Sequence, residues 1–113
     1  MEKEIYYHQG DVLYLDFSPS VDTEINGIRP AVVVSNDSYN RHTGYLMVVP
    51  VTTHGTGFGS YVSLNGYRHF HGRANASQAH CYSVARAKSG VLGQLRVQDF
   101  NRIKRKVEEV MSF

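Results

Sequence analysis

The segment Gly27-Ile28-Arg29-Pro30-Ala31-Val32-Val33-Val34-Ser35-Asn36 decides the fold of this chain. Residues 30–34 form a continuous apolar run that ends in three valines, a pattern typical of a strand buried on both faces. A proline is tolerated at the first position of a strand, where no backbone donor is needed. The run therefore predicts a central strand that begins at Pro30, with Arg29 placed immediately before it by a glycine loop.

Polar side chains stand where this strand begins and where the next apolar run ends. Residues 46–51 are apolar and are followed by Thr52, Thr53 and His54. A guanidinium group forms bidentate contacts with phosphate, so this pair of strand ends is a candidate phosphate-binding site. By spacing alone, Arg29 is equally well explained as a surface arginine that caps carbonyls or pairs with Glu24, and Thr52 and Thr53 are better explained as ordinary strand residues.

Length and composition predict one globular domain over residues 1–113, with 42% hydrophobic residues. No apolar segment is as long as a membrane span, and the mixed-charge start Met1-Glu2-Lys3-Glu4 does not resemble a signal peptide. The single cysteine, Cys81, excludes an internal disulfide and fits a reducing compartment. Because Cys81 lies in an apolar run, we expect a buried core thiol, and we expect the protein in the cytoplasm.

The formal net charge is only +2, but most of the 12 basic residues are arginines, and they are accompanied by 6 histidines and 8 tyrosines. These side chains bind phosphates or stack on bases, so the composition permits RNA binding without requiring it.

Hydrophobic periodicity predicts several short strands followed by one helix. The strands are expected over residues 12–17, 30–35, 45–52 and 61–64, with a turn or short helix over residues 36–40. Residues 74–85 read as one strand interrupted by a bulge near Gln78. Apolar residues at helical intervals then predict a C-terminal helix with one apolar face, carried by Val97, Phe100, Ile103, Val107, Val110 and Met111. This order predicts a mainly β fold, an antiparallel barrel-like sheet with a C-terminal helix.

Several familiar site patterns are missing. Gly55-Thr56-Gly57-Phe58-Gly59 lacks the Lys-Ser/Thr of a nucleotide loop, and no Gly-x-Ser-x-Gly elbow occurs. His69 and His71 have no cysteine or carboxylate beside them, so we predict no metal site. The basic side of the last helix is interpreted as a solvated face, with nucleic-acid contact as the alternative.

Nearly the whole chain resembles the MazF/PemK family of toxin ribonucleases from type II toxin–antitoxin systems. The matching features are Gly10-Asp11-Val12, Asp16-Phe17-Ser18-Pro19, Glu24, Gly27-x-Arg29-Pro30, Pro50-Val51-Thr52-Thr53, Ser77-Gln78 and Ser83-Val84-Ala85-Arg86. The resemblance implies a compact SH3-like barrel of the CcdB/PemK type that forms a homodimer. It also implies cofactor-free, metal-independent and sequence-selective cleavage of single-stranded RNA, in which the ribose 2′-hydroxyl attacks the adjacent phosphorus.

The resemblance assigns catalysis to Arg29 and Thr52. Attack on phosphorus builds negative charge on the non-bridging oxygens, which a fixed guanidinium stabilises most in the transition state. The threonine hydroxyl orients the same phosphate or the attacking 2′-hydroxyl. By analogy with a lost oxyanion donor, removal of either group is expected to raise the barrier by about 2–4 kcal/mol. RNA binding is assigned to Glu24, Thr53, His54, Ser77 and Gln78.

One departure from the family limits this assignment. Some PemK-type members carry Arg-x-Asp-Gln before the later strand, with the arginine and aspartate as acid and base, whereas this chain reads Asn75-Ala76-Ser77-Gln78. Only the scheme with Arg29 and Thr52 carries over, and the general base stays unassigned. The family also implies a small acidic antitoxin whose extended tail occupies the arginine-lined RNA groove or blocks the flexible loops.

Two other functions stay open at the level of sequence. A relative of the CcdB type would poison DNA gyrase through its C-terminal helix. A non-catalytic barrel would bind RNA or a peptide without cutting it. The presence of both Arg29 and Thr52 at strand ends favours the nuclease.

Overall fold

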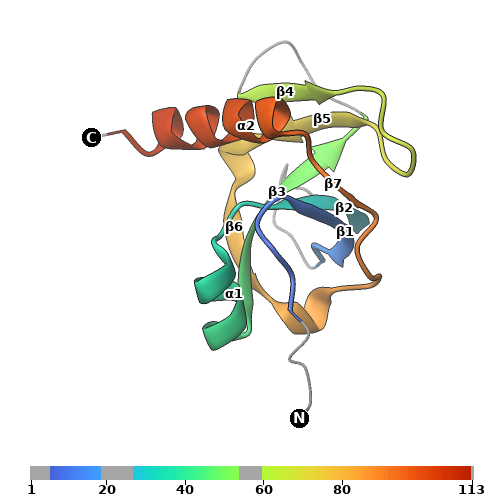
Figure 1. Ribbon diagram of the computed structural model, residues 1–113, viewed down its shortest axis with the longest axis vertical. Helices are drawn as coiled ribbons and strands as arrows, with labels where there is room; N and C mark the ends of the chain where they lie inside the picture. Colours follow the sequence, from blue (N-terminus) through green and yellow to red (C-terminus); the bar gives the residue numbers. More distant parts are fainter. Residues whose placement is uncertain (1–5, 19–26, 54–59, 113) are drawn as a thin grey trace.

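The computed structural model describes residues 6–18, 27–53 and 60–112. In these residues the elements follow one another as β1 (Asp11–Asp16), β2 (Ile28–Val33), α1 (Asp37–Thr43), β3 (Tyr45–Thr52), β4 (Tyr61–Leu64), β5 (Gly72–Asn75), η1 (Ala76–Gln78), β6 (His80–Ser83), η2 (Val84–Arg86), β7 (Gly93–Gln94) and α2 (Val97–Val110) (Figure 1). The strands form one antiparallel sheet in the order β4-β5-β3-β2-β1-β7, and β6 also pairs with β3. The predicted fold class, a curled antiparallel sheet with a C-terminal helix, is confirmed.

Both faces of the central strands are covered by apolar side chains, as the valine run predicts. One face packs against α2 through a cluster that includes Val32, Val49, Val62, Leu64 and Ile103. The other face carries a second cluster, which includes Leu13, Phe17, Ala31, Leu46 and Val48. Side chains alternate along each strand, so successive residues of β2 and β3 belong to opposite clusters.

Strand β2 begins at Ile28, two residues earlier than the valine run predicts, so Pro30 is not its first residue. Pro30 lies opposite Tyr14 of β1, whose backbone N–H and C=O are bonded to Ser89 Oγ and the Lys88 N–H instead. No donor toward β1 is therefore required of Pro30. Pairing between β2 and β3 starts only at Ala31, so the proline marks the end of that ladder.

The second edge of β3 has two partners, and this overturns the single strand predicted over residues 74–85. Strand β6 pairs with the first half of β3, and β5 pairs with Val51 and Thr52 at its end. Between the two partners lies Pro50, which has no N–H to donate. The chain crosses from β5 to β6 through the 3₁₀ turn η1, whose first N–H groups are capped by Asn75. The interruption near Gln78 is thus a change of strand and not a bulge.

Helix α1 follows Asn36, whose side chain accepts from the Tyr39 N–H at 2.8 Å, as the predicted cap requires. Helix α2 lies along β4 and β5 at one end of the molecule, whereas α1 lies toward the other end (Figure 1). The apolar stripe of α2 is buried only in its middle, because Val97, Val110 and Met111 are exposed. No helix of the described residues is long and apolar enough to span a membrane.

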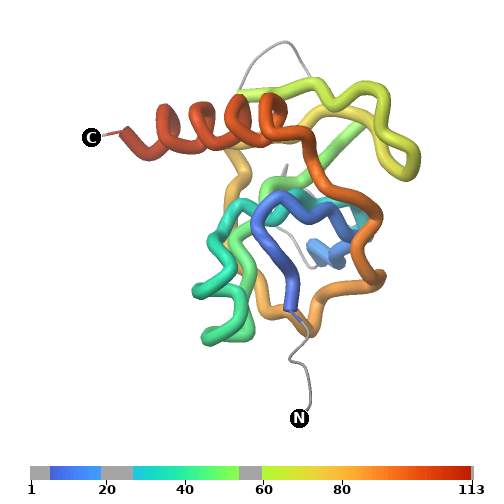
Figure 2. The backbone as a smooth tube through the Cα atoms, in the orientation of Figure 1, coloured from blue at the N-terminus to red at the C-terminus, as the bar shows by residue number. Residues whose placement is uncertain are grey.

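The segment between β6 and α2 passes along the outside of β1 (orange in Figure 2). It is held there by backbone hydrogen bonds from Lys88, Leu92 and Leu95 to the carbonyls of Tyr14, Val12 and Gly10. The polar edge of β1 is therefore closed by a chain segment far away in sequence.

Candidate functional site

The structure brings Arg29 and Thr52 to adjacent strands on one face of the sheet. The β2–β3 ladder ends with Ala31 opposite Pro50, and Arg29 and Thr52 each lie two residues beyond that last pair, on neighbouring strands. Directly opposed residues of an antiparallel pair share a face, and alternation puts these two on the side of the second cluster. We call this surface the Arg29–Thr52 face. Arg29 is half-buried and Thr52 is 6% exposed.

The approach to Arg29 is fixed by contacts at the ends of β1 and β2. The Phe17 N–H donates to the Gly27 carbonyl at 2.9 Å, and the Gly27 N–H donates to Ser18 Oγ at 2.8 Å. Gly27 has φ of 82°, a left-handed conformation that glycine adopts at little cost. The chain therefore turns into β2 at Gly27, and Arg29 is the second residue of that strand.

A second arginine supports the same region. Arg86 Nη1 donates to the Asp16 carbonyl at 3.1 Å and to the Ser18 carbonyl, and its guanidinium carbon lies 5.3 Å from the centre of the Tyr82 ring. Tyr82 in turn meets Phe17 edge to face, at 5.2 Å between ring centres. Arg86 thus ties the end of β1 to β6.

Thr52 is held by the backbone of β5. A Cβ built on Gly72 would lie 2.5 Å from the Thr52 carbonyl oxygen, and Gly72 has φ of 129°. Only glycine accommodates both the conformation and this close approach. The register Thr52–Arg73 then sets an arginine directly beside Thr52 on the Arg29–Thr52 face.

Three of the five residues assigned to RNA binding lie in the part of the chain that the structure describes. Thr53 follows β3 directly and is exposed, while Ser77 (exposed) and Gln78 (half-buried) lie in η1, which packs against β3 and α2. Glu24 and His54 lie outside the described residues. Three of the five residues assigned to RNA binding are therefore located, Thr53 at the end of β3 and Ser77 and Gln78 in η1, which contacts β3. Their roles stay predictions.

Sequence reasoning missed other polar residues of the same face. Tyr82 and His80 of β6 lie opposite Leu46 and Val48, and Arg73 of β5 lies opposite Thr52. Arg73 also stacks near the Tyr61 ring, at 5.9 Å from its centre. The signal that locates these residues is strand register, which exists only once the partners of β3 are known.

The prediction of a core thiol is wrong, because Cys81 is exposed. Within β6 it pairs with Met47 and lies at the rim of the sheet, where the Tyr39 hydroxyl of α1 contacts its sulfur at 3.7 Å. Over the described residues no group of three or more His, Cys, Asp or Glu side chains is arranged to hold a metal ion.

Comparison with known proteins gives the family. Residues 8–111 match the model of the PemK-like, MazF-like toxin of type II toxin–antitoxin systems. The chain belongs to this family. The resemblance inferred from the sequence motifs is thereby confirmed over nearly the whole chain.

Relatives and solved structures agree with this membership. The chain is 44% identical over 57 residues to the endoribonuclease toxin MazF of Escherichia coli K12, which covers 50% of this chain and 51% of that protein. It is 41% identical over 44 residues to endoribonuclease EndoA of Bacillus subtilis, with 39% and 38% covered. The chain thus spans about half the length, or less, of these curated relatives.

The fold extends beyond the segments that align in sequence. The MazF crystal structure from Deinococcus radiodurans superimposes with a TM-score of 0.88 at 23% identity, covering 97% of this chain and all of that one. A mycobacterial endoribonuclease in complex with its cognate antitoxin superimposes with a TM-score of 0.78 at 22% identity, covering 93% and 94%. The family fold therefore extends over nearly the whole chain.

Proposed function

We propose that this protein is a sequence-selective, metal-independent endoribonuclease toxin that cleaves single-stranded RNA. The observation that carries the proposal is that Arg29 and Thr52 lie on the same face of the neighbouring strands β2 and β3, each two residues beyond the last pair of their ladder. The pair combines a permanent cation with a hydroxyl on one face, which suits binding of a phosphodiester. The named relatives are endoribonucleases, and this family membership supports the same class of reaction.

In the proposed reaction the ribose 2′-oxygen attacks the adjacent phosphorus while the bond to the 5′-oxygen of the next nucleotide breaks. The proton of the 2′-hydroxyl is removed, and the departing 5′-oxygen receives a proton. The products are a 2′,3′-cyclic phosphate and a 5′-hydroxyl. Arg29 stabilises the charge that builds on the non-bridging oxygens, and Thr52 orients the phosphate.

The surroundings of the pair suit this role. Thr52 is buried and held by the Gly72 backbone, so its hydroxyl is directed without a large loss of side-chain freedom on binding. Arg73 and Tyr61 next to it offer a second cation and a ring for stacking. Thr53, Ser77 and Gln78, together with Glu24 and His54, are proposed to contact the RNA on either side.

We further propose the biological setting that family membership suggests. The toxin acts in the cytoplasm as a homodimer and is neutralised by a small acidic antitoxin. Solved relatives include a mycobacterial endoribonuclease with its cognate antitoxin and MazE–MazF complexes from Deinococcus radiodurans. An acidic segment is attracted to the arginines of the Arg29–Thr52 face and competes with RNA there.

The direct test incubates the purified protein with a long single-stranded RNA in excess EDTA and maps the new ends. Discrete cuts are expected, and Arg29→Ala and Thr52→Ala are each expected to lower the cleavage rate by about 10²–10³-fold. Lys88→Ala, an exposed cation on the segment between η2 and β7, is the control for loss of charge and is expected to cleave at the wild-type rate. Intact RNA after incubation with folded wild-type protein would refute the nuclease.

A further inference from the structure

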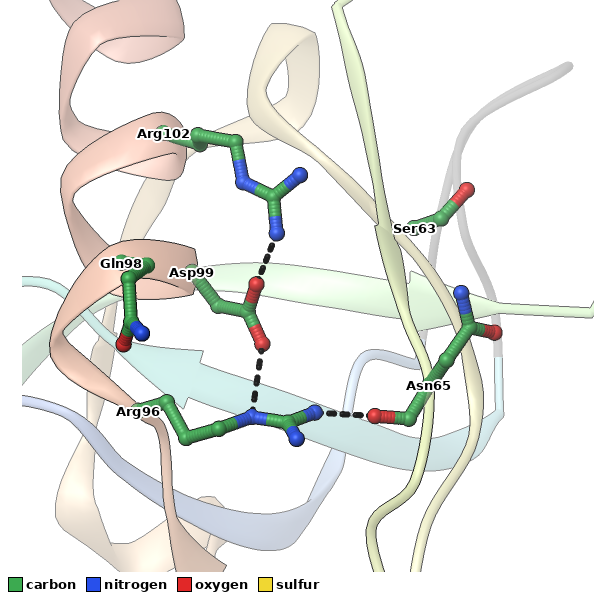
Figure 3. A pocket seen from close by; sticks show the side chains of 6 residues that line it. All are labelled: Ser63, Asn65, Arg96, Gln98, Asp99 and Arg102. Carbon is green, nitrogen blue, oxygen red and sulfur yellow. Dashed lines mark hydrogen bonds and ion pairs between the residues drawn. The ribbon is translucent and has the colours of Figure 1, made fainter.

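A groove separates α2 from the edge strand β4, on the far side of β5 from Thr52. It consists of two adjoining hollows of about 490 Å³ and 380 Å³, and both are lined by Ser63 and Arg102. The first hollow is drawn in Figure 3, with Arg96, Asp99 and Arg102 of the α2 region on one side and Ser63 and Asn65 on the other. The Asn65 carbonyl points toward Arg96, whereas the side chains of Ser63 and Asn65 point away from the helix. The second continues along the helix past Arg105 and Lys106. The two hollows therefore form one continuous channel along the helix.

The helix side of the groove carries an excess of positive charge. Asp99 is buried and is paired with both Arg96 and Arg102, so one carboxylate faces two guanidinium groups (Figure 3). Further along, Lys106 pairs with Glu109 at 3.7 Å. Arg105 forms no ion pair within the part of the chain that the structure describes. Cations that outnumber the carboxylates leave the groove attractive to a polyanion.

The strand side of the groove is neutral and polar. Residues 61–65 contain no charged side chain, and the Ser63 hydroxyl and Asn65 amide lie at the outer rim of the groove, on the side of β4 away from the helix. Ser63 is exposed and lies on the edge strand of the sheet. A polyanion would therefore be attracted by the helix wall and would meet no like charge on the strand wall.

The groove is also connected to the candidate catalytic pair by strand register. Thr52 of β3 pairs with Arg73 of β5, and Arg73 pairs with Ser63 of β4. These three side chains form a row across one face of the sheet, and with neighbouring strands about 4.8 Å apart, Ser63 lies about 10 Å from Thr52. A few nucleotides of a single strand are long enough to follow this row from Thr52 to the rim of the groove.

We propose that the α2–β4 groove binds the sugar–phosphate backbone of the RNA that flanks the cleavage site. This inference rests on the proposed ribonuclease function and adds a second binding surface to it. Arg102, Arg105 and Lys106 contact phosphates, while Ser63, on the same face as Thr52 and Arg73, contacts the strand where it reaches the rim of the groove. Contacts of this kind hold the strand without reading its bases, so the groove raises affinity for long RNA and leaves sequence selectivity to the Arg29–Thr52 face.

The groove suits RNA better than an acidic peptide. A peptide that adds to an edge strand needs free backbone groups there, yet Arg96 Nη2 already donates to the Asn65 carbonyl at the end of β4. Peptide grooves also contain apolar pockets for side chains, and Tyr61 and Val62 are the sole apolar residues among the described ones that line this groove. The walls thus offer cations for phosphate groups and little for a hydrophobic anchor.

The test compares two double variants of equal charge. Arg105→Gln/Lys106→Gln removes two cations of the groove, whereas Lys88→Gln/Lys104→Gln removes two exposed cations outside it. Arg96 and Arg102 are left intact because they pair with buried Asp99. The probe is fluorescent single-stranded RNA of about 16 nucleotides with 2′-O-methyl sugars, which lack the attacking hydroxyl, and its affinity is measured by anisotropy from low to high salt.

The groove variant is expected to bind this RNA about tenfold more weakly than the control variant at 0.1 M salt, with a slope of log affinity against log salt smaller by about 1.4. Cleavage of a dinucleotide, which has one nucleotide on each side of the scissile bond and is too short to reach the groove, is expected to be equal in both variants. Equal affinities and equal salt slopes of the two variants for the long RNA would overturn the proposal that the groove binds RNA.

Two further measurements distinguish the failure of the proposed RNA binding in the groove from the failure of the proposed ribonuclease function. If wild-type protein cleaves no RNA, the proposed function fails, while the contrast between the variants still tests the groove. If a polyglutamate peptide binds in a manner that depends on Arg105 and Lys106 while the long RNA does not, the groove binds an acidic protein segment and the RNA assignment is wrong.

Discussion

Thr52 depends on a glycine twenty residues away in sequence. Gly72 is the first residue of β5, and its missing side chain allows its backbone to lie against the Thr52 carbonyl. A hydroxyl that orients a phosphate must be held within a fraction of an ångström, since small displacements at a reacting centre are costly. The position of Thr52 is therefore determined by β5 as much as by β3.

Gly72→Ala is expected to lower RNA cleavage by at least tenfold and to destabilise the fold by about 1–3 kcal/mol, because the new Cβ would collide with the Thr52 carbonyl in a backbone conformation that alanine avoids. Gly90→Ala is the matched control, since a Cβ there meets nothing within 4 Å and its φ is not in the left-handed region. Thermal unfolding and initial cleavage rates measure the two effects. Equal rates in both variants would show that Gly72 does not position Thr52.

Arg29, Thr52 and Cys81 show what can be predicted about a residue from its neighbours in the sequence. Arg29 and Thr52 were identifiable because each adjoins an apolar run and matches a family motif. The burial of Cys81 was predicted wrongly, because an apolar neighbourhood does not distinguish a central strand from β6 at the rim of the sheet. Arg73 was missed, because nothing in its own segment indicates that it lies beside Thr52.

Between elements, a polar network joins the β4–β5 hairpin to α2. The Tyr67 hydroxyl donates to Asp99 Oδ2 at 2.5 Å and accepts from the Arg96 N–H at 2.9 Å. Tyr67 also stacks on Phe70, and the Arg96 guanidinium lies 4.4 Å from its ring centre. The first turn of α2 is thus fastened to the hairpin beside the proposed RNA groove.

Tyr67→Phe is expected to reduce the free energy of unfolding at neutral pH by about 1–3 kcal/mol, because a buried carboxylate loses its donor. Burial alone raises the pKa of Asp99, but the hydrogen bonds from Tyr67 and Arg102 outweigh it and hold the pKa below its usual range. Such a carboxyl stabilises the fold above its unfolded pKa, and the contribution disappears as pH falls through the folded pKa.

The difference in unfolding free energy between wild type and Tyr67→Phe should therefore narrow as pH falls below 3.8, the ordinary pKa of the carboxyl. Denaturant titrations at several pH values measure it, with Tyr45→Phe, an exposed tyrosine of β3, as the control. A difference that stays constant through the acid range would show that the stabilisation does not act through the Asp99 carboxylate.

At the scale of the elements, the sequence predicts where helices and strands lie better than it predicts which strands pair with one another. The bounds of β3 and β4 and the cap of α1 agree with the structure, because hydrophobic periodicity and cap chemistry are local. The split of residues 74–85 between β5 and β6 was not foreseeable, since it arises where β3 changes partner at Pro50. The apolar stripe of α2 was predicted over its full length, but only Phe100, Ile103 and Val107 pack in the core, because periodicity does not show how much of a stripe has a partner.

For the molecule as a whole, the fold unites segments that are far apart in the chain around one surface. β2, β3, β5 and β6 all contribute side chains to the Arg29–Thr52 face, and β4 with α2 forms the groove at its margin. A family fold that persists at 23% identity keeps this arrangement of strands while the loops vary. The central claim is that this face catalyses attack of a 2′-hydroxyl on phosphorus.

The most direct measurement uses an RNA cut at one mapped position and the same oligonucleotide with a single 2′-deoxyribose on the 5′ side of the scissile bond. Mass spectrometry of the products in excess EDTA is expected to show a 2′,3′-cyclic phosphate and a 5′-hydroxyl from the RNA, and no cleavage at that bond of the substituted strand. Cleavage of the substituted strand at an unchanged rate would show that the 2′-hydroxyl is not the nucleophile and would contradict the account.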